Sequence, residues 1–298
     1  MPKDAGRAVA CFARAARQGL QEAQYNLGYC YWQGEGIEKD QEEALRLFTL
    51  AASQGVAEAH YFLGEAHSKG IGGRPINKEQ AIRSYTIAAE AGMAKAQYRL
   101  GNRCEDEGKK AAAVGWYRKA AQQRYAEAQY KLGYACFHGS GIKQNKVEGI
   151  EWYIKAANQG VAKAQSDLGA FYLTGLRVAV DKVQAIRWLT AAAEQGVAEA
   201  CYNLGTCYRD GDGVAKNKTS SDYYLDKAAT QAALQGNKEV ERAARELLAG
   251  SSDSKTMDIR VSKPVLSGNS SAFFNGQEHK EGRSNLCVEL CSKGCVVL

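Results

Sequence analysis

Apolar residues recur along this chain at the three- and four-residue spacing of amphipathic helices, and the helices recur with a longer period of about 36 residues. Each unit contains a Leu-Gly pair with an Ala four residues before the Leu, and a second block that ends in paired alanines. The Leu-Gly pairs are Leu27-Gly28, Leu63-Gly64, Leu100-Gly101, Leu132-Gly133, Leu168-Gly169 and Leu204-Gly205. We therefore expect two helices in every unit, helix A with the Leu-Gly pair and helix B with the paired alanines.

Polar residues and glycines mark the ends of helix B. In four units a capping residue stands three positions before Glu or Gln, the spacing of a capping box: Asp40 with Glu43, Asn77 with Gln80, Asn145 with Glu148, and Asp181 with Gln184. A Gly that suits a left-handed helix end follows helix B at Gly19, Gly55, Gly92, Gly160 and Gly196. Most units also have Gly-x-Gly between the helices. It predicts a turn, because it follows a helix rather than a strand and no Walker pattern closes it.

Taken together, the pattern Ala-x-Ala-x-Tyr-x-Leu-Gly, then Gly-x-Gly, then Ala-x-x-Trp-Tyr-x-x-Ala-Ala-x-x-Gly resembles the Sel-one-like repeat, a longer-looped relative of the tetratricopeptide repeat. The resemblance covers residues 20–235. It implies an all-α fold, a right-handed α/α superhelical solenoid of about six repeats. The third unit departs from the pattern because it is short and has Gly108 alone in its loop, and the fifth has Arg177 in place of the second loop Gly.

The expected organisation is a solenoid over residues 1–250 and a flexible tail over residues 251–298. The solenoid would comprise a half-repeat at 4–19, six repeats at 20–236 and a capping helix at 237–249. The half-repeat either caps the solenoid or follows residues that lie upstream of this sequence. From Ser251 the composition changes to Ser, Gly, Asn, Lys and Glu, which is typical of a flexible tether.

The last four residues, Cys295-Val296-Val297-Leu298, have the form of a prenylation box. A Leu in the final position favours a geranylgeranyl group on Cys295. A single lipid gives only reversible membrane binding, and Cys287 and Cys291 are candidate palmitoylation sites that would strengthen it. We therefore expect a protein held on the cytosolic face of a membrane by its lipid.

Charge and composition exclude other classes. The net charge of +6 is not gathered into runs, so nucleic-acid binding has little support. The sequence has no apolar stretch of the signal-peptide or membrane-spanning type, so the nine cysteines are expected to stay reduced.

We predict no catalytic site, no cofactor, no metal and no small-molecule substrate, although sequence leaves open a triad assembled across repeats. His60 and His67 share a helix but have no third ligand. Six cysteines are interpreted as small core residues: Cys11, Cys30, Cys104, Cys136, Cys201 and Cys207.

The partner surface is expected on the concave face, which helix A lines in such solenoids. Tyr25, Tyr61, Tyr98 and Tyr130 form one inward column, but this column belongs to the repeat pattern, which favours a packing role. Tyr29, Trp32, Tyr134 and Phe137 are aromatic where the pattern does not require it. Because aromatic residues anchor interfaces, these four are the preferred partner contacts.

The sequence is therefore interpreted as a non-catalytic adaptor tethered to a membrane. Sel-one-like repeats joined to a prenylation box resemble the fungal chitin-synthase activators, which implies a role in activating or targeting a membrane enzyme. Three alternatives stay open: a soluble signalling or degradation adaptor, a bacterial effector prenylated by its host, and a hydrolase like that claimed for some cysteine-rich bacterial relatives. The hydrolase is disfavoured because this chain lacks their regular cysteine pair.

Overall fold

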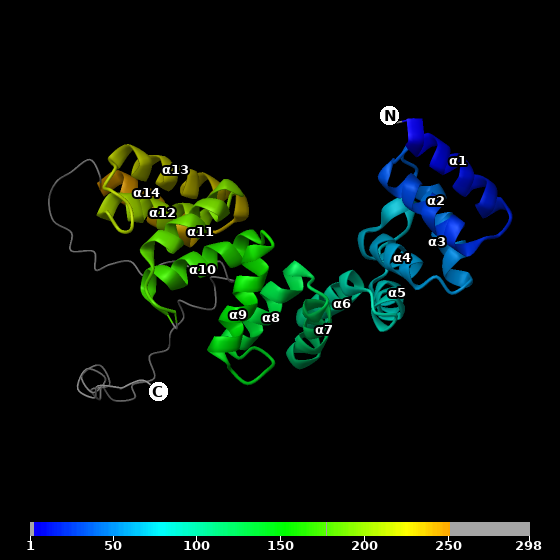
Figure 1. Cartoon of the computed structure of the whole chain (residues 1–298), viewed down its shortest axis with the longest axis horizontal. Coiled ribbons are helices and arrows are strands. Elements are labelled where there is room, and N and C mark those ends of the chain that lie inside the picture. Colours follow the sequence, from blue (N-terminus) through cyan, green and yellow to red (C-terminus); the bar gives the residue numbers. More distant parts are fainter. Residues whose placement is uncertain (1–2, 177, 251–298) are drawn as a thin grey trace. The chain divides into compact units, whose positions relative to one another are not determined.

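The computed structural model describes residues 3–176 and 178–250, and all regular secondary structure in them is helical (Figure 1). The elements in chain order are α1 (Lys3–Arg17), α2 (Gln21–Gln33), α3 (Gln41–Ser53), α4 (Ala57–Lys69), the short 3₁₀ helix η1 (Ile71–Gly73), α5 (Lys78–Glu90), α6 (Ala94–Asp106), α7 (Lys110–Gln122), α8 (Ala126–His138), α9 (Lys146–Asn158), α10 (Ala162–Thr174), α11 (Lys182–Glu194), α12 (Ala198–Asp210), α13 (Lys218–Gln235) and α14 (Lys238–Gly250). From α2 to α13, even numbers are helix A and odd numbers are helix B.

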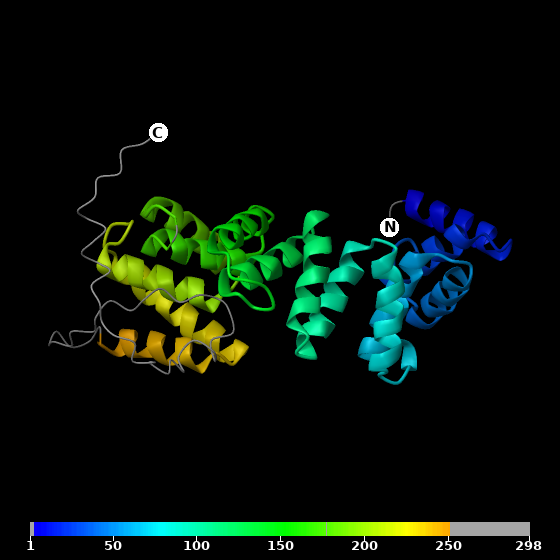
Figure 2. The same ribbon diagram turned by 90° about the horizontal axis from the view of Figure 1, so that it is seen from below.

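Each helix packs against the next one in the chain, and the contacts are most extensive within the pairs α2–α3, α4–α5, α6–α7, α8–α9, α10–α11 and α12–α13. Both ribbon views show this succession of paired helices (Figures 1 and 2). The predicted all-α solenoid of repeated helix pairs is confirmed.

The starts of helix B follow the capping residues. The Oδ1 atom of each accepts a hydrogen bond from the backbone N–H three residues later, at 3.0 Å for Asp40, 3.0 Å for Asn77, 3.2 Å for Asn145 and 2.9 Å for Asp181. Asn217 caps α13 in the same way: its Oδ1 atom accepts a hydrogen bond from the backbone N–H of Ser220 at 3.0 Å. The sequence does not mark this cap as a capping box, because position 220 is neither Glu nor Gln. These bonds satisfy N–H groups that the first helical turn leaves unpaired.

The Gly of each Leu-Gly pair lets helix B approach helix A closely. A Cβ atom placed at Gly64 would lie 2.7 Å from the ring of Tyr85, and one at Gly101 would lie 2.6 Å from the ring of Tyr117. On the facing side, the first Ala of each pair is fully buried: Ala51, Ala88, Ala120, Ala156, Ala192 and Ala228. Small residues on both helices therefore set the spacing within each unit.

The last helix lies where the capping helix was expected. It packs against α13 and α12, and its Val240 and Ala244 side chains are buried there. Within residues 3–176 and 178–250, no helix is both long and apolar enough to cross a membrane.

Candidate functional site

The four aromatic residues proposed as partner contacts differ in how far they are buried. Phe137 on α8 is only 4% exposed, and its ring stacks on Phe171 with the centroids 4.8 Å apart. Helix α9 carries Gly149 where it faces Phe137, and a Cβ atom there would lie 2.8 Å from the Phe137 backbone. Because the two helices approach so closely, Phe137 is a core residue, and its assignment as a surface anchor is corrected.

Tyr29, Trp32 and Tyr134 keep part of their surface accessible. Tyr29 on α2 is 36% exposed, with its ring edge-on to Phe62 at 5.9 Å. Trp32 is half-buried, and its ring contacts Phe62 at 5.5 Å. Tyr134 on α8 is also half-buried and lies 4.4 Å from the ring of His138.

The tyrosine column lies mainly in the packed interior. Tyr61 and Tyr130 are buried, while Tyr25 and Tyr98 are half-buried. The Tyr130 hydroxyl lies 3.3 Å from Asp167 of the next unit, and the Tyr61 ring packs 6.0 Å from Tyr85. These contacts are those of a packing column.

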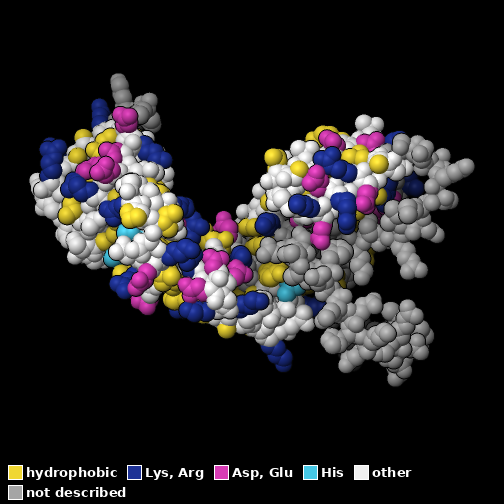
Figure 3. All heavy atoms as spheres, turned by 180° about the vertical axis from the view of Figure 1, so that it is seen from behind, with side chains coloured by type: hydrophobic (Ala, Val, Ile, Leu, Met, Phe, Trp, Pro, Cys, Tyr) yellow, Lys and Arg dark blue, Asp and Glu magenta, His cyan; other side chains and the backbone are white. Residues whose placement is uncertain are grey.

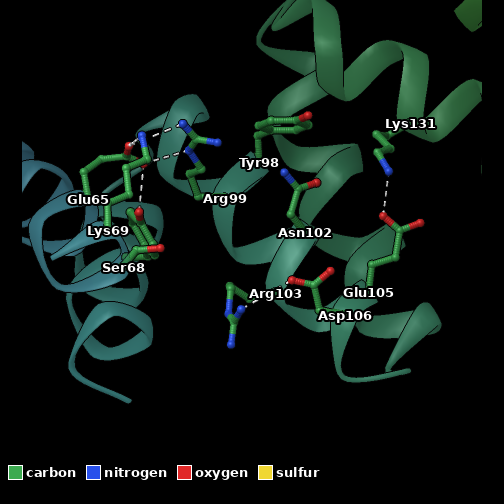
Figure 4. Close-up of a pocket in the computed structure, with 11 residues that line it drawn as sticks. Glu65, Ser68, Lys69, Tyr98, Arg99, Asn102, Arg103, Glu105, Asp106 and Lys131 are labelled. Carbon is green, nitrogen blue, oxygen red and sulfur yellow. Dashed lines mark hydrogen bonds and ion pairs between the residues drawn. The ribbon is translucent and has the colours of Figure 1, made fainter. Parts of the chain in front are cut away.

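A pocket of about 390 Å³ lies among α4, α5, α6 and α8, and charged side chains dominate its lining (Figure 4). Its walls are formed by Glu65, Ser68, Lys69, Tyr85, Tyr98, Arg99, Asn102, Arg103, Glu105, Asp106 and Lys131. Four of these residues are basic and three are acidic. The pocket therefore joins the A helices of units two, three and four in one polar site.

Glu65 is the centre of the first ion cluster. Its side chain is 7% exposed, and it accepts bonds from Arg99 Nε at 2.8 Å, from the Tyr85 hydroxyl at 2.8 Å and from Lys69 Nζ. Burial alone would raise the pKa of Glu65, but the bonds from Lys69 and Tyr85 and the charge of Arg99 outweigh burial and lower it. Burial and the adjacent Glu65 raise the pKa of Tyr85, so its hydroxyl stays a donor.

Glu105 repeats this arrangement one unit later. It accepts a hydrogen bond from the Tyr117 hydroxyl at 2.8 Å and one from Lys131 Nζ at 2.7 Å, and Tyr117 also lies 2.7 Å from Asn102 Oδ1. Burial would raise the pKa of Glu105, but Lys131 and Tyr117 lower it. In both clusters a carboxylate on helix A binds a Tyr of its own helix B and a cation on the next helix A.

Residues of helix A contact the next helix A between consecutive units, and of these contact residues the sequence had indicated Tyr29 but not Phe62, Glu65 or Arg99. In units one and two, the residue two positions after the Leu contacts the residue one position before the next Leu. This pairing brings Tyr29 to Phe62 and Glu65 to Arg99. The signal was present in the sequence, because the position one residue before the Leu changes character from Phe62 to Arg99 and Lys131 while the repeat pattern leaves it unspecified.

The body cysteines only partly fit the core interpretation. Cys30, Cys136, Cys201 and Cys207 are buried, whereas Cys104 is half-buried and Cys11 is exposed, so the interpretation is corrected for Cys11. Burial raises the pKa of Cys136 and Cys201 to about 11 and that of Cys207 to about 12, which keeps these thiols protonated.

Two other predictions concern metals and lipids. No group of three or more His, Cys, Asp or Glu side chains in the described part of the chain could hold a metal ion. The proposed lipid sites Cys287, Cys291 and Cys295 lie outside the described residues.

Charges of both signs are interspersed over the face seen in Figure 3, without a single basic patch. On this face acidic side chains lie close to the basic ones in several places. Such a surface does not have the clustered Lys and Arg that phosphate backbones require.

Comparisons with known proteins agree with the repeat architecture. The Sel1 repeat profile matches residues 1–20, 21–56, 57–93, 94–125, 126–161, 162–197 and 198–233, so the opening helix counts as a matched segment of its own. The search of curated proteins found no match.

Two solved bacterial structures share the fold. A protective antigen of uropathogenic Escherichia coli that displays an SLR fold is 33% identical, with a TM-score of 0.68, over 83% of this chain and 53% of the antigen. This chain thus spans about half of that structure. A Sel1 repeat protein from Oxalobacter formigenes is 31% identical, with a TM-score of 0.63, over 79% of this chain and 68% of its own. Sel1 repeat proteins typically act as protein-interaction scaffolds. On the matched segments and the identity to these structures, the chain belongs to the Sel1 repeat family.

Proposed function

We propose that this protein is an interaction scaffold that binds a protein partner on its A-helix face, the surface formed by the solvent-facing side chains of α2, α4, α6 and α8. One observation carries the proposal. The positions that the repeat leaves variable on these adjacent helices hold accessible aromatic and charged side chains, among them Tyr29, Arg99 and Tyr134.

Within each repeat, the residues that pack the helices differ from the residues that remain accessible, which supports this function. The Leu, Gly and Ala residues of the pattern, together with the buried tyrosines, hold the helix pairs together. The variable positions are therefore available for a partner. A well-placed aromatic anchor at an interface typically contributes about 2 kcal/mol or more when it is buried.

Site-directed crosslinking and affinity measurement test the proposal. A photo-crosslinking amino acid at Tyr29 or Tyr134 should capture a partner, whereas the same group at Ile87 on α5, which is 45% exposed, should not. Tyr29→Ala and Tyr134→Ala should each weaken binding of the captured partner by about tenfold or more. Ile87→Ala is the matched control. Equal crosslinking from both faces, or affinity unchanged by both Tyr variants, would overturn the proposal.

We also propose that the scaffold is held on a membrane by prenylation of Cys295. The support is the sequence Cys295-Val296-Val297-Leu298 itself and the architectural resemblance to fungal chitin-synthase activators, by which the partner would be a membrane enzyme. The intact mass of the protein from eukaryotic cells should show a geranylgeranyl group that Cys295→Ser removes. The wild-type protein should sediment with membranes and the variant should not. An unmodified wild-type protein would instead support a soluble adaptor.

A further inference from the structure

The carboxylates of Glu65 and Glu105, in the pocket among α4, α5, α6 and α8, already bind donors of the protein. Glu65 Oε1 accepts bonds from Arg99 and Tyr85, and its Oε2 accepts one from Lys69. Glu105 Oε2 accepts bonds from Tyr117 and Lys131. Both carboxylates are thus held in place by donors of the protein itself.

Donors, in contrast, remain available in the same pocket. Arg103 Nε is buried and has no hydrogen-bond partner among the described residues, and the guanidinium binds Asp106 only through Nη1, at 3.3 Å. A guanidinium carries five N–H donors, so most of those of Arg103 are unused. The Asn102 side chain contacts the Tyr117 hydroxyl at 2.7 Å. An amide carries two N–H donors, so at least one of them remains for another acceptor. In Figure 4, Asn102 lies between the Glu65 and Glu105 clusters.

The net charge of the residues that line the pocket favours a ligand group with a single negative charge. Four basic and three acidic side chains leave one net positive charge. A single negative charge balances it, whereas a doubly charged phosphate would bring an excess negative charge close to Glu65, Glu105 and Asp106. A carboxylate also matches the planar fork of an arginine.

The pocket has room for such a group and is open to solvent. Its volume of about 390 Å³ falls within the range of ligand pockets, roughly 300–1,000 Å³. The Lys69 and Asp106 side chains at its edge are 54% and 65% exposed. Space exists here because the column that holds Trp32 in unit one holds Ser68 and Glu105 in units two and three.

We propose that this pocket binds a Glu or Asp side chain of an acidic segment in a partner protein. Arg103 and the amide of Asn102 donate to the entering carboxylate, and Lys131 and Arg99 supply the surrounding positive charge. This inference rests on the proposed scaffold function and specifies the chemistry of the partner at one place on the A-helix face.

Fluorescence anisotropy with defined peptides tests the proposal. The probe is a fluorescein-labelled, end-blocked peptide of alternating Gly and Glu, compared with the same peptide carrying Gln and with one carrying phosphoserine. The Glu peptide should bind at least about tenfold more tightly than the Gln peptide, and added salt should weaken it. Equal binding of the Glu and Gln peptides, no binding of the Glu peptide, or tighter binding of the phosphoserine peptide would overturn the proposal.

Substitutions in the full-length protein locate the binding. Arg103→Gln should weaken the Glu peptide by about tenfold, the size expected for one charge-assisted hydrogen bond. Arg83→Gln on α5 is the matched control, because Arg83 is 74% exposed and lies outside the pocket, and it should change affinity less than about twofold. An Arg103→Gln protein with the wild-type affinity would refute the site.

Two measurements keep the outcome interpretable. Wild-type-like melting of Arg103→Gln establishes that the variant is folded. If it melts early, the Arg103 Nε–H resonance of the wild-type protein is followed by NMR instead, and it should shift as the Glu peptide is added, while an unmoved resonance counts against the site. Failure of the peptide experiments together with successful crosslinking from Tyr29 would reject the pocket while leaving the scaffold function standing.

Discussion

Among single residues, four buried glutamines connect consecutive units through hydrogen bonds of their side chains. Each occupies the position three residues before the Leu of helix A: Gln24, Gln97, Gln129 and Gln165. Gln129, for example, donates from Nε2 to the Ala121 carbonyl of the preceding helix B at 3.2 Å, and its Oε1 accepts from Gln159 of its own helix B at 2.6 Å. One side chain thus ties together three helices.

Gln129→Leu should lower the free energy of unfolding by about 1 kcal/mol, because it removes the two hydrogen bonds that Gln129 makes with the Ala121 carbonyl and the Gln159 amide. Chemical denaturation measures the change. The control is Gln122→Leu, since Gln122 is exposed at the end of α7. Equal stabilities of the two variants would show that the glutamine bonds contribute nothing.

Glu65 makes stability depend on pH. Burial alone would raise its pKa, but its bonding partners lower it below the ordinary value of 4.5. The unfolded chain therefore binds this proton more tightly than the folded one. The stabilisation is complete above the unfolded-state pKa and is lost as pH falls through the folded-state pKa.

Glu65→Gln should cost about 1–3 kcal/mol of unfolding free energy near neutral pH, and its difference from the wild type should shrink on acidification below about pH 4. Urea denaturation of the variant and the wild type, at neutral pH and again below about pH 4, measures this difference. Glu79→Gln, which breaks only the exposed pair with Arg83, should change little at either pH. A Glu65→Gln deficit that stays constant on acidification would contradict the assignment.

Close packing of α8 against α9 governs stability at the scale of elements. A Cβ atom at Gly133 would lie 3.0 Å from the Gly149 carbonyl oxygen and 3.2 Å from Tyr153 N, both backbone atoms. Gly133→Val should therefore destabilise the protein by about 2–4 kcal/mol. Gly115→Ala in α7 is the control: nothing lies within 4 Å of its Cβ position, so it should stabilise by about 0.5–1 kcal/mol. Thermal melting separates them, and unchanged melting of Gly133→Val would mean that the helices have room to separate.

The helix pairs were predictable because local residues encode them. The Leu-Gly and paired-Ala signals and the capping residues such as Asp40 act within one unit, and the structure places them as expected. Phe137 could not be assigned in the same way. Its burial depends on Gly149 in another helix, which allows α9 to approach α8 and cover the ring.

The pocket escaped prediction for a similar reason. Glu65 meets Arg99, and Glu105 meets Lys131, only when successive units stack. The aromatic side chains of Tyr29 and Tyr134 stand out in the sequence, whereas nothing within one unit indicates that Glu65 and Glu105 meet cations of the next unit. The charge pairing becomes visible only when positions of adjacent units are compared.

Nearest-neighbour packing sets the behaviour of the solenoid as a whole. Contacts run from each helix to the next, so disturbance at one end should stay near that end. Val240→Asp, which buries a charge between α14 and the last repeat, should speed amide hydrogen exchange in α12 to α14 and leave α2 to α5 unchanged. A uniform rise in exchange over all described helices would instead indicate one cooperative unit.

The central claim, that the A-helix face receives the partner, is tested most directly by hydrogen exchange with and without the protein captured by crosslinking. Both series of helices are measured at once in the same sample, so each serves as the reference for the other. We predict that binding protects amides and slows exchange in α2, α4, α6 and α8, while α3, α5, α7 and α9 change little. Protection confined to α3, α5, α7 and α9, or spread equally over both series, would contradict the account.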